Sequence, residues 1–340
     1  MNRKPFLPLL FIATSLVLAD CNLPRLQIKE ATQTPTLVTP TDTAPPPLPK
    51  AELGLAENPL ILALPPSADS QAEIDAAKVI ASQFTERTGY VVVTVTSDSD
   101  GALVDALEKG NAHIVLLEPY SYELAYQKGL VKASYAAVKD GKSKYGAQFI
   151  ASRKAGFTSY FNPLNETNTV NDSSITLAQL QEKKPCWSDE TSPSGYVIPL
   201  GYLNSNQVIT KPAAFVEGHP SVVRALYASG ICDFGATYID ARKFPSLEDE
   251  FPDLLEQVIV IWRIPEIIPY DVLAFSTNMP QPMRDLFANI IPAILQTDAG
   301  KAAFKTAYDI EELEPVNDAF YNEFRKYIEE SGVELSTLLK

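Results

Sequence analysis

The feature that most constrains the fold is a repeated alternation of short apolar runs with segments of helical periodicity. An apolar run at residues 59–67 precedes a segment at 70–89, whose apolar residues recur at helical spacing and which ends at a glycine. Apolar runs at 90–96 and 113–119 are followed by similar segments, also closed by glycines. Strands that alternate with helices are typically parallel, and continuously apolar strands are buried on both faces. We therefore predict an α/β fold.

This alternation occurs twice along the chain. A polar stretch at 162–174 interrupts it, and a second series of helices and strands follows, closed by an amphipathic helical segment. Two such series predict two lobes, formed by residues 57–155 plus 272–340 and by residues 156–271. Because ligands of open α/β sheets collect at the carboxyl ends of the strands, we expect a ligand cleft between the lobes.

The N-terminus has the composition of a targeting signal. Two basic residues precede an apolar run at 6–19, which is the order of a secretory signal peptide and is short for a membrane span. The run ends in LADC, which resembles a bacterial lipoprotein box, so we predict a signal peptide at 1–21 and lipidation of Cys21. Asp20 departs from the small residue usual before that cysteine, and the alternative is an ordinary signal peptide with an incidental cysteine.

Residues 22–56 are predicted to form a tether. Most of this segment, 31–52, is rich in proline and threonine and has no apolar period. Such a sequence cannot bury enough surface to offset the entropy lost on ordering. We therefore expect the folded part to be held beside a membrane, on its extracytoplasmic side.

Charge and cysteine content narrow the class of function. The formal net charge is −14 and no cluster of lysine and arginine stands out, which argues against a nucleic-acid partner. Outside the cytoplasm Cys186 and Cys232 can form a disulfide, and two buried free thiols are an equal alternative. The two histidines lie far apart in sequence and no Cys/His spacing indicates a metal site, so we expect no metal and no cofactor.

The stretch TSPSGYVIPLGYL, residues 191–203, follows a predicted strand and opens a predicted helix. A helix start presents backbone N–H groups without internal partners and a partial positive charge. The hydroxyls of Ser192 and Ser194 add donors, and Gly195 permits close approach, so the segment is a candidate anion site. The alternative is that Ser192 only caps the helix, with Pro193 at its first position.

Together with that stretch, the segments 215–243 and 258–276 follow in an order that resembles the substrate-binding proteins of phosphonate, phosphate and phosphite ABC transporters, the phosphonate-binding (PhnD-like) family. The resemblance extends from about residue 59 to residue 325. It implies a two-lobed periplasmic-binding-protein fold of type II, whose lobes close on a small anionic or zwitterionic ligand. It also implies an ABC permease as partner, a monomeric protein and no enzymatic activity.

The resemblance assigns ligand contacts to particular residues. Ser192, Ser194 and the amides around Gly195 would hold the phosphonate oxygens, and His219 would donate to the same group. The alternative for His219 is a capping or surface role. Asp240 and Asp271 fall where binders of aminoalkylphosphonates place acids against the ligand amine, and their alternative is that of solvated loop acids.

Several positions depart from the family pattern. Pro193 replaces a threonine, Asp100 stands where a tyrosine begins a helix, His113 replaces an aspartate, and Glu118 belongs to a pair that replaces an aromatic–glycine pair. Tyr122 or Tyr120 is expected to supply the missing aromatic wall. An aminoalkylphosphonate is our first interpretation of the ligand, and another small zwitterion is the second.

Two other classes of protein are alternatives to a transport receptor. Ser194, His219 and Asp233 are the residue types of a hydrolase triad, but the Gly-x-Ser-x-Gly elbow is absent, as are nucleotide-binding and zinc signatures. A binding protein that signals to a membrane sensor, without transport, is the other alternative.

Overall fold

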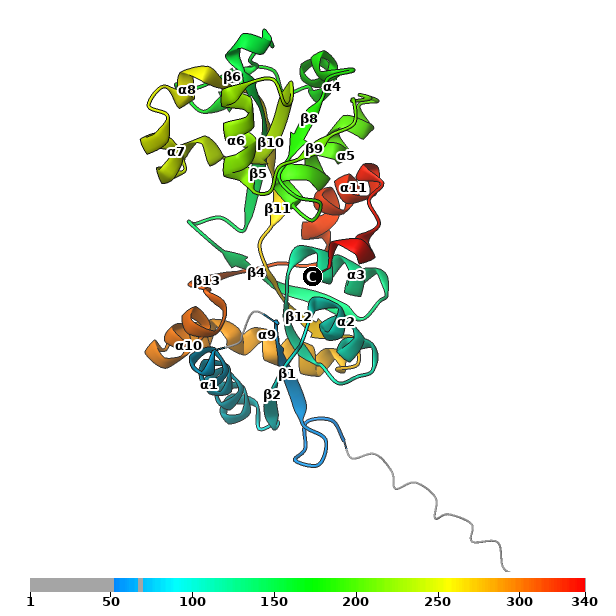
Figure 1. The fold of residues 1–340 in the computed structure, drawn as a ribbon. Coiled ribbons are helices and arrows are strands. Elements are labelled where there is room, and N and C mark those ends of the chain that lie inside the picture. Colours follow the sequence, from blue (N-terminus) through cyan, green and yellow to red (C-terminus); the bar gives the residue numbers. More distant parts are fainter. Residues whose placement is uncertain (1–51, 67–69, 340) are drawn as a thin grey trace, which may run out of the picture. The chain divides into compact units, whose positions relative to one another are not determined.

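The computed structural model describes residues 52–66 and 70–339, and Figure 1 shows their α/β architecture. The predicted signal peptide, Cys21 and most of the predicted tether lie outside the described residues. Within the described part of the chain, no helix is both long enough and apolar enough to cross a bilayer. The strands of this part form a six-stranded sheet, a five-stranded sheet and one two-stranded ribbon. The predicted α/β class is confirmed.

The first sheet has the strand order β13-β4-β12-β3-β1-β2. β1 is parallel to both β2 and β3, whereas β12 is antiparallel to β3 and β4. The strands are β1 (Leu60–Leu64), β2 (Val92–Thr96), β3 (Ile114–Leu117), β4 (Val131–Val138), β12 (Val272–Ser276) and β13 (Glu312–Pro315). The helices that go with them are α1 (Gln71–Thr88), α2 (Asp100–Glu108), α3 (Pro119–Gln127), α9 (Gln281–Leu295) and α10 (Asp298–Tyr308).

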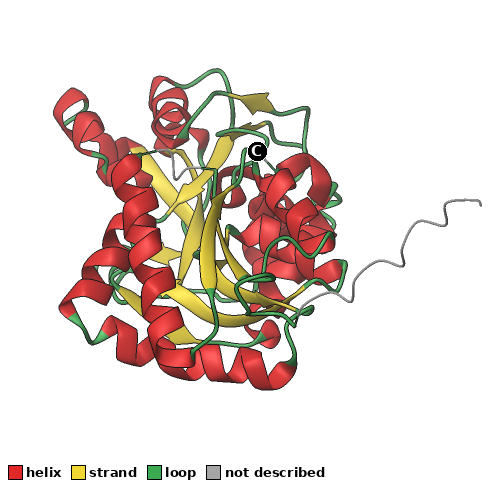
Figure 2. Ribbon diagram, turned by 90° about the horizontal axis from the view of Figure 1, so that it is seen from below, coloured by secondary structure: helices red, strands yellow, loops and turns green. Residues whose placement is uncertain are grey.

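The second sheet has the order β11-β5-β10-β8-β9. β8 is parallel to β9 and β10, whereas β5 is antiparallel to β10 and β11. Its strands are β5 (Lys144–Ser152), β8 (Pro185–Trp187), β9 (Ala214–Phe215), β10 (Phe234–Tyr238) and β11 (Val258–Pro269), and β6 (Phe161–Asn162) and β7 (Thr167–Asn168) form the ribbon. Its helices are α4 (Ser173–Leu177), α5 (Ile198–Ser205), α6 (His219–Ala228), α7 (Pro245–Glu250), α8 (Leu254–Gln257) and α11 (Asn322–Ser331). Figure 2 shows helices on both sides of the strands.

The two sheets repeat one topology. In each, a first strand lies between two parallel neighbours, and the next position is taken by an antiparallel strand that arrives from the other half of the chain, β12 in the first sheet and β5 in the second. The chain therefore passes between the sheets at 139–143 and again at 270–271. The first passage comes earlier than the lobe boundary expected at residue 155, because β5 pairs with β10 and β11.

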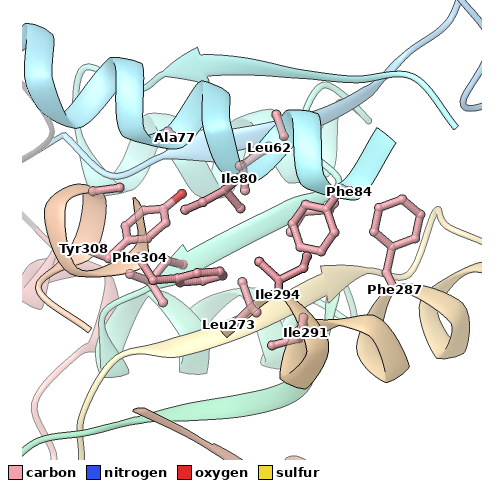
Figure 3. Packing of buried hydrophobic residues seen from close by; sticks show 14 of the residues in the cluster. Leu62, Ala77, Ile80, Phe84, Leu273, Phe287, Ile291, Ile294, Phe304 and Tyr308 are labelled. Carbon is pink, nitrogen blue, oxygen red and sulfur yellow. The ribbon is translucent and has the colours of Figure 1, made fainter. Parts of the chain in front are cut away.

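The first lobe is built on local signals that the sequence carries plainly. Ser70 caps α1, its hydroxyl accepts from the Glu73 N–H in a capping box, and Gly89 ends the helix with a φ of 77°. The apolar face of α1 packs against α9 and α10, as Figure 3 shows for Phe84, Phe287 and Phe304. Burial of each such aromatic side chain stabilises the fold by about 1.5–3 kcal/mol.

The C-terminal segment joins the second lobe rather than the first. Phe324 and Ile328 of α11 are buried in the core cluster of the second sheet, and the Tyr327 ring stacks on Tyr202 with centroids 3.8 Å apart. On its other side, Arg325 of α11 donates to both carboxylate oxygens of Glu123 in α3. Because α3 belongs to the first lobe, α11 connects the two lobes.

A disulfide joins Cys186 and Cys232, the pair that the sequence left open. It links β8 to the loop that leads into β10, across 46 residues of chain. In the chain-entropy view, a bridge across a loop of this length restricts the unfolded chain strongly. The strand that leads to the candidate anion segment is thereby fixed to its neighbour.

We expect Gly201→Ala to destabilise the protein by ~1–3 kcal/mol, because a Cβ there would lie 2.1 Å from the Tyr327 carbonyl oxygen and force α5 away from α11. Gly101→Ala in α2 is the matched control, since its Cβ would meet only Ser99 Oγ at 3.8 Å. Helix propensity predicts that this change is neutral or stabilising by up to ~1 kcal/mol. Urea unfolding measures both variants, and equal stabilities would contradict the packing of α11 on α5.

Candidate ligand-binding site

One edge of the second sheet gathers the candidate residues. The carboxyl ends of β8 and β10 meet the amino end of β5 there, because Cys186 pairs with Gly235 and Tyr238 pairs with Ala147. Ser188 directly follows β8, and Tyr145 is the second residue of β5. The predicted anion segment continues from β8, so it lies at the sheet edge where ligands of α/β proteins are found.

The anion segment begins with a π-helical turn, Pro193–Val197, that leads into α5. Ser192 caps this turn: its Oγ accepts the Gly195 N–H at 2.9 Å. The capping role of Ser192 is therefore present, and the Gly195 amide is already satisfied. The Ser192 hydroxyl proton is still available to a ligand, and the Ser194 N–H donates to no other residue in the described part of the chain.

Gly195 is held where no larger residue fits. A Cβ at this position would lie 1.9 Å from Ser188 Oγ and 2.9 Å from Ser192 Oγ. The backbone adds further links, since Ser188 N–H donates to the Gly195 carbonyl and Gly218 N–H donates to the Ser188 carbonyl. These contacts bring Ser188, Gly195 and the start of α6 at His219 into one cluster, although about thirty residues separate its ends.

Polar atoms in and beside this cluster are buried without hydrogen-bond partners. Among the described residues these include Ser188 Oγ, His219 Nδ1 and the Tyr120 hydroxyl. Leaving a buried polar atom unpaired costs about 1–3 kcal/mol, so native proteins seldom do so without a purpose. Their grouping around a helix start is what a site for a hydrogen-bonding ligand requires.

His219 lies at the first position of α6, with its ring edge-on to Tyr238 at 4.8 Å between centroids. Burial lowers the pKa of His219, and the nearby Asp189 carboxylate opposes that effect only in part. The imidazole is therefore neutral at pH 7 and offers one N–H donor.

Tyr145 connects this cluster to the first lobe. Burial raises the pKa of its hydroxyl, and the Ser194 side chain acts on that pKa in the opposite direction. The charges of Asp271 and Glu118 also act on the Tyr145 side chain. Tyr120 of α3 approaches from the first lobe, with its ring stacked on Phe324 at 5.8 Å. Residues of both lobes therefore meet at this site.

The facing edge of the first sheet carries acids. Glu118 follows β3 and Asp271 precedes β12, and the two are neighbours because Leu117 pairs with Val272. A pocket of about 380 Å³ opens beside them. Burial raises the pKa of Asp271, Lys139 opposes this and Asp100 adds to it. Within residues 52–66 and 70–339, the Asp271 carboxylate has no hydrogen bond or ion pair.

Asp240 does not share this environment. Its side chain is only 3% exposed, and it receives hydrogen bonds from Arg242 at 2.5 and 2.9 Å and from Gln148 at 2.7 Å. Burial would raise the pKa of Asp240, but the hydrogen bonds and charge of Arg242 outweigh it, so the pKa lies below its ordinary value. Its carboxylate is already neutralised by arginine and is neither a solvated loop acid nor free for an amine.

Two other residues singled out in the sequence, Tyr122 and Asp233, lie away from the site. Tyr122 is fully buried in the first lobe and its hydroxyl donates to Asp318 at 2.7 Å, so Tyr120 is the tyrosine beside the site. Asp233 lies before β10, at the opposite end of that strand from Ser194 and His219, and accepts the Lys184 N–H. The three residue types of a hydrolase triad are therefore not assembled.

Sequence reasoning missed Ser188 and Tyr145. Ser188 is completely buried, and it becomes a candidate only through its contact with Gly195, which no local motif reveals. Tyr145 reads in the sequence as an ordinary strand residue. The signal that could have found it is its place at the start of a strand that enters the second sheet from the other lobe.

The family described as "ABC transporter, phosphonate, periplasmic substrate-binding protein" matches residues 62–321. The chain belongs to this family. It is accordingly an extracytoplasmic substrate-binding component of a transport system, with the type II periplasmic-binding-protein fold that the sequence predicts. None of the curated proteins compared with the chain matches it in sequence.

Solved structures agree with this fold. XAC2383 from Xanthomonas citri bound to ATP has a TM-score of 0.57 and 14% identity over 82% of this chain and 97% of its own. The structure of XAC2383 bound to chloride ion has a TM-score of 0.56 and 15% identity, and the match covers 82% of this chain and 98% of its own. PhnD1 from Prochlorococcus marinus in complex with methylphosphonate has a TM-score of 0.47 and 14% identity, and the match covers 80% of this chain and 98% of its own. At such identities the likeness to XAC2383 concerns the fold alone, and nothing is concluded from PhnD1, whose TM-score is below 0.5.

We expect the pKa of His219 in the ligand-free protein to lie below its ordinary value of 6.5, because burial disfavours the charged ring. The pKa is lowered on folding, so this group stabilises the fold above pH 6.5, and that stability is lost as the pH falls through the folded pKa. Titration of the two histidines by NMR, with His113→Gln for assignment, measures it. A pKa at or above 6.5 would contradict the buried, neutral ring.

Proposed function

We propose that this protein is a receptor for a small zwitterion that carries a phosphonate group and an amine, with an aminoalkylphosphonate as the first choice, and that it delivers this ligand to an ABC permease. The observation that carries the proposal is the group of buried polar atoms without partners, Ser188 Oγ and His219 Nδ1 of the second lobe and the Tyr120 hydroxyl of α3. The first lobe supplies acids nearby, since the charges of Asp271 and Glu118 act on Tyr145 beside this group.

The second lobe would hold the phosphonate. Ser192, Ser194 and Ser188 offer hydroxyl donors, the Ser194 amide offers its N–H, and neutral His219 offers one more. Charge-assisted hydrogen bonds to an anion are shorter and about twice as strong as neutral ones. Gly195 contributes by its size, because its missing side chain leaves room beside Ser188 and Ser192.

The first lobe would hold the amine. Asp271 is the proposed partner, with the charges of Glu118 and Asp100 nearby. An unpaired carboxylate with a raised pKa gains most from a cationic neighbour, which restores its charged form. Asp240 is not part of this proposal, because arginine already neutralises it.

Binding at both lobes would couple to their closure. The ligand would bridge donors of the second lobe and acids of the first, so it would bind the closed arrangement more tightly than an open one. Tyr145 and Asp271 lie next to the two chain passages, where such a motion would bend the chain. The closed form would then dock on the permease.

We also propose that the protein is monomeric and is anchored through a lipid on Cys21, with residues 22–56 as the tether. The disulfide between Cys186 and Cys232 supports an oxidising, extracytoplasmic location. A sensor role that uses the same site, without transport, is the alternative to delivery. A permease and ATPase encoded beside the gene would favour transport.

The double variant Ser194→Ala/His219→Ala should weaken phosphonate binding by about tenfold or more, since charge-assisted hydrogen bonds contribute ~1.5–3 kcal/mol each. A thermal-shift screen of phosphate, phosphite, alkylphosphonates, aminoalkylphosphonates and sulfonates identifies the ligand class, and calorimetry then measures the affinity. Unchanged affinity in a folded double variant would remove the assignment of the anion site.

Asp271→Asn should reduce the affinity for 2-aminoethylphosphonate by about tenfold and that for ethylphosphonate little, because only the first ligand carries an ammonium. Asp240→Asn is the control variant, because Asp240 lies outside the proposed amine site. It should destabilise folding by ~3–5 kcal/mol through loss of a buried partner of Arg242, with no selective loss of the amine-bearing ligand. Equal losses for both ligands in Asp271→Asn would contradict the assignment of the amine.

A further inference from the structure

A second pocket lies in the second lobe, at the sheet edge opposite the candidate ligand site. Its volume is about 460 Å³, and its lining includes Lys154, Lys184 and Lys211. Lys184 immediately precedes β8, and Ser152, another lining residue, is the last residue of β5. The candidate ligand site, in contrast, lies where β8 ends and β5 begins. The two sites therefore occupy opposite ends of the same strands.

The three lysines of this pocket are not paired. Across the described ranges, none of them has a carboxylate oxygen within 4.0 Å of its ammonium group, whereas Lys128, for example, pairs with Glu108 at 2.8 Å. The pocket contains one acid, Asp233, whose carboxylate accepts the Lys184 backbone N–H at 2.7 Å. Three ammonium groups against one carboxylate make this a positive pocket on a chain of net charge −14.

Neutral donors line the same pocket. The hydroxyls of Ser152 and Ser229 lie at its wall, where they are hydrogen-bonded to each other at 3.2 Å, and Ser229 Oγ also donates to the Leu226 carbonyl at 3.4 Å. The N–H groups of Gly230 and Ile231 donate to no residue in the part of the chain that the structure describes. Ser229 and Gly230 both have positive φ, 63° and 96°, which turns the chain sharply at the rim. The disulfide at Cys232 ties this rim to β8.

We propose that this pocket is a second anion site that binds the phosphate group of an organic phosphate ester. Several ammonium groups together with hydroxyl and amide donors are the chemistry that recognises a multiply charged tetrahedral oxyanion. Like charges gathered around one pocket repel each other, and a bound anion relieves that repulsion. The ester can come from a soluble metabolite, as a dianionic phosphate monoester, or from the headgroup of an anionic phospholipid, as a monoanionic phosphodiester, and both present charged phosphate oxygens.

The test uses the full-length chain in the Ser194→Ala/His219→Ala background, so that the first site does not contribute. Glycerol phosphate, measured by calorimetry, represents the soluble source, and phosphatidylglycerol vesicles, measured by co-sedimentation, represent the lipid, with phosphatidylcholine vesicles as the neutral reference. The test variant is Lys154→Gln/Lys184→Gln/Lys211→Gln. The matched control is Lys109→Gln/Lys301→Gln/Lys326→Gln, which removes the same charge from exposed positions elsewhere.

We expect saturable binding of at least one probe, weakened about tenfold or more by the pocket variant and less than about twofold by the control, since each exposed ammonium contributes modestly. Binding should also fall as salt is added. If Lys184→Gln impairs folding, the double variant Lys154→Gln/Lys211→Gln replaces the triple variant, because it changes only exposed residues. This double variant should show an intermediate loss of binding. No binding of either probe, or equal losses in the pocket and control variants, would overturn the proposal. Neither result would affect the assignment of the first anion site, around Ser194 and His219.

Discussion

The antiparallel strand that each sheet receives from the other half of the chain is the constraint on which the rest of the structure depends. β12 completes the first sheet and β5 completes the second, so the two chain passages at 139–143 and 270–271 arrive at the edges where parallel strands end. The passages are joined, since Tyr270 N–H donates to the Ser143 carbonyl and the Tyr270 ring stacks on Tyr145 at 5.1 Å. Tyr145 and Asp271 therefore lie at the candidate site next to the connections between the lobes, and a ligand bound there would act directly on the segments that bend when the lobes close.

The edges of the two sheets that meet at the candidate site differ in the polar groups they present. The second lobe presents donors, among them buried groups without partners. The first lobe presents acids, one of which, Asp271, has a raised pKa and no hydrogen bond or ion pair in the described chain. Each arrangement is costly by itself, because an unpaired buried donor and a desolvated carboxylate both lose the interactions that water would provide. A ligand that is anionic at one end and cationic at the other offsets both costs at once, which a simple anion cannot do.

The sequence predicts the parts of this architecture that depend on local signals. Ser70 and Gly89 delimit α1, and the apolar runs mark β1, β2 and β3, because caps and periodicity are short-range features. The sequence does not predict β4 and β13, because their sequences are mixed in polarity. β4 is placed by its pairing with β12, and β13, which is largely exposed, is placed by its pairing with β4. At the site, Ser194 and His219 follow from motif and resemblance. The engagement of Asp240 by Arg242, and the contact of Ser188 with Gly195, depend on residues brought together only by the fold.

The most direct measurement of the central claim is a crystal structure of the protein grown with 2-aminoethylphosphonate. We expect phosphonate oxygens within hydrogen-bond distance of Ser188 Oγ, the Ser194 amide and the His219 ring, with the ligand nitrogen beside the Asp271 carboxylate. A ligand located elsewhere, or one bound in the reverse orientation with its amine among the serines, would contradict it.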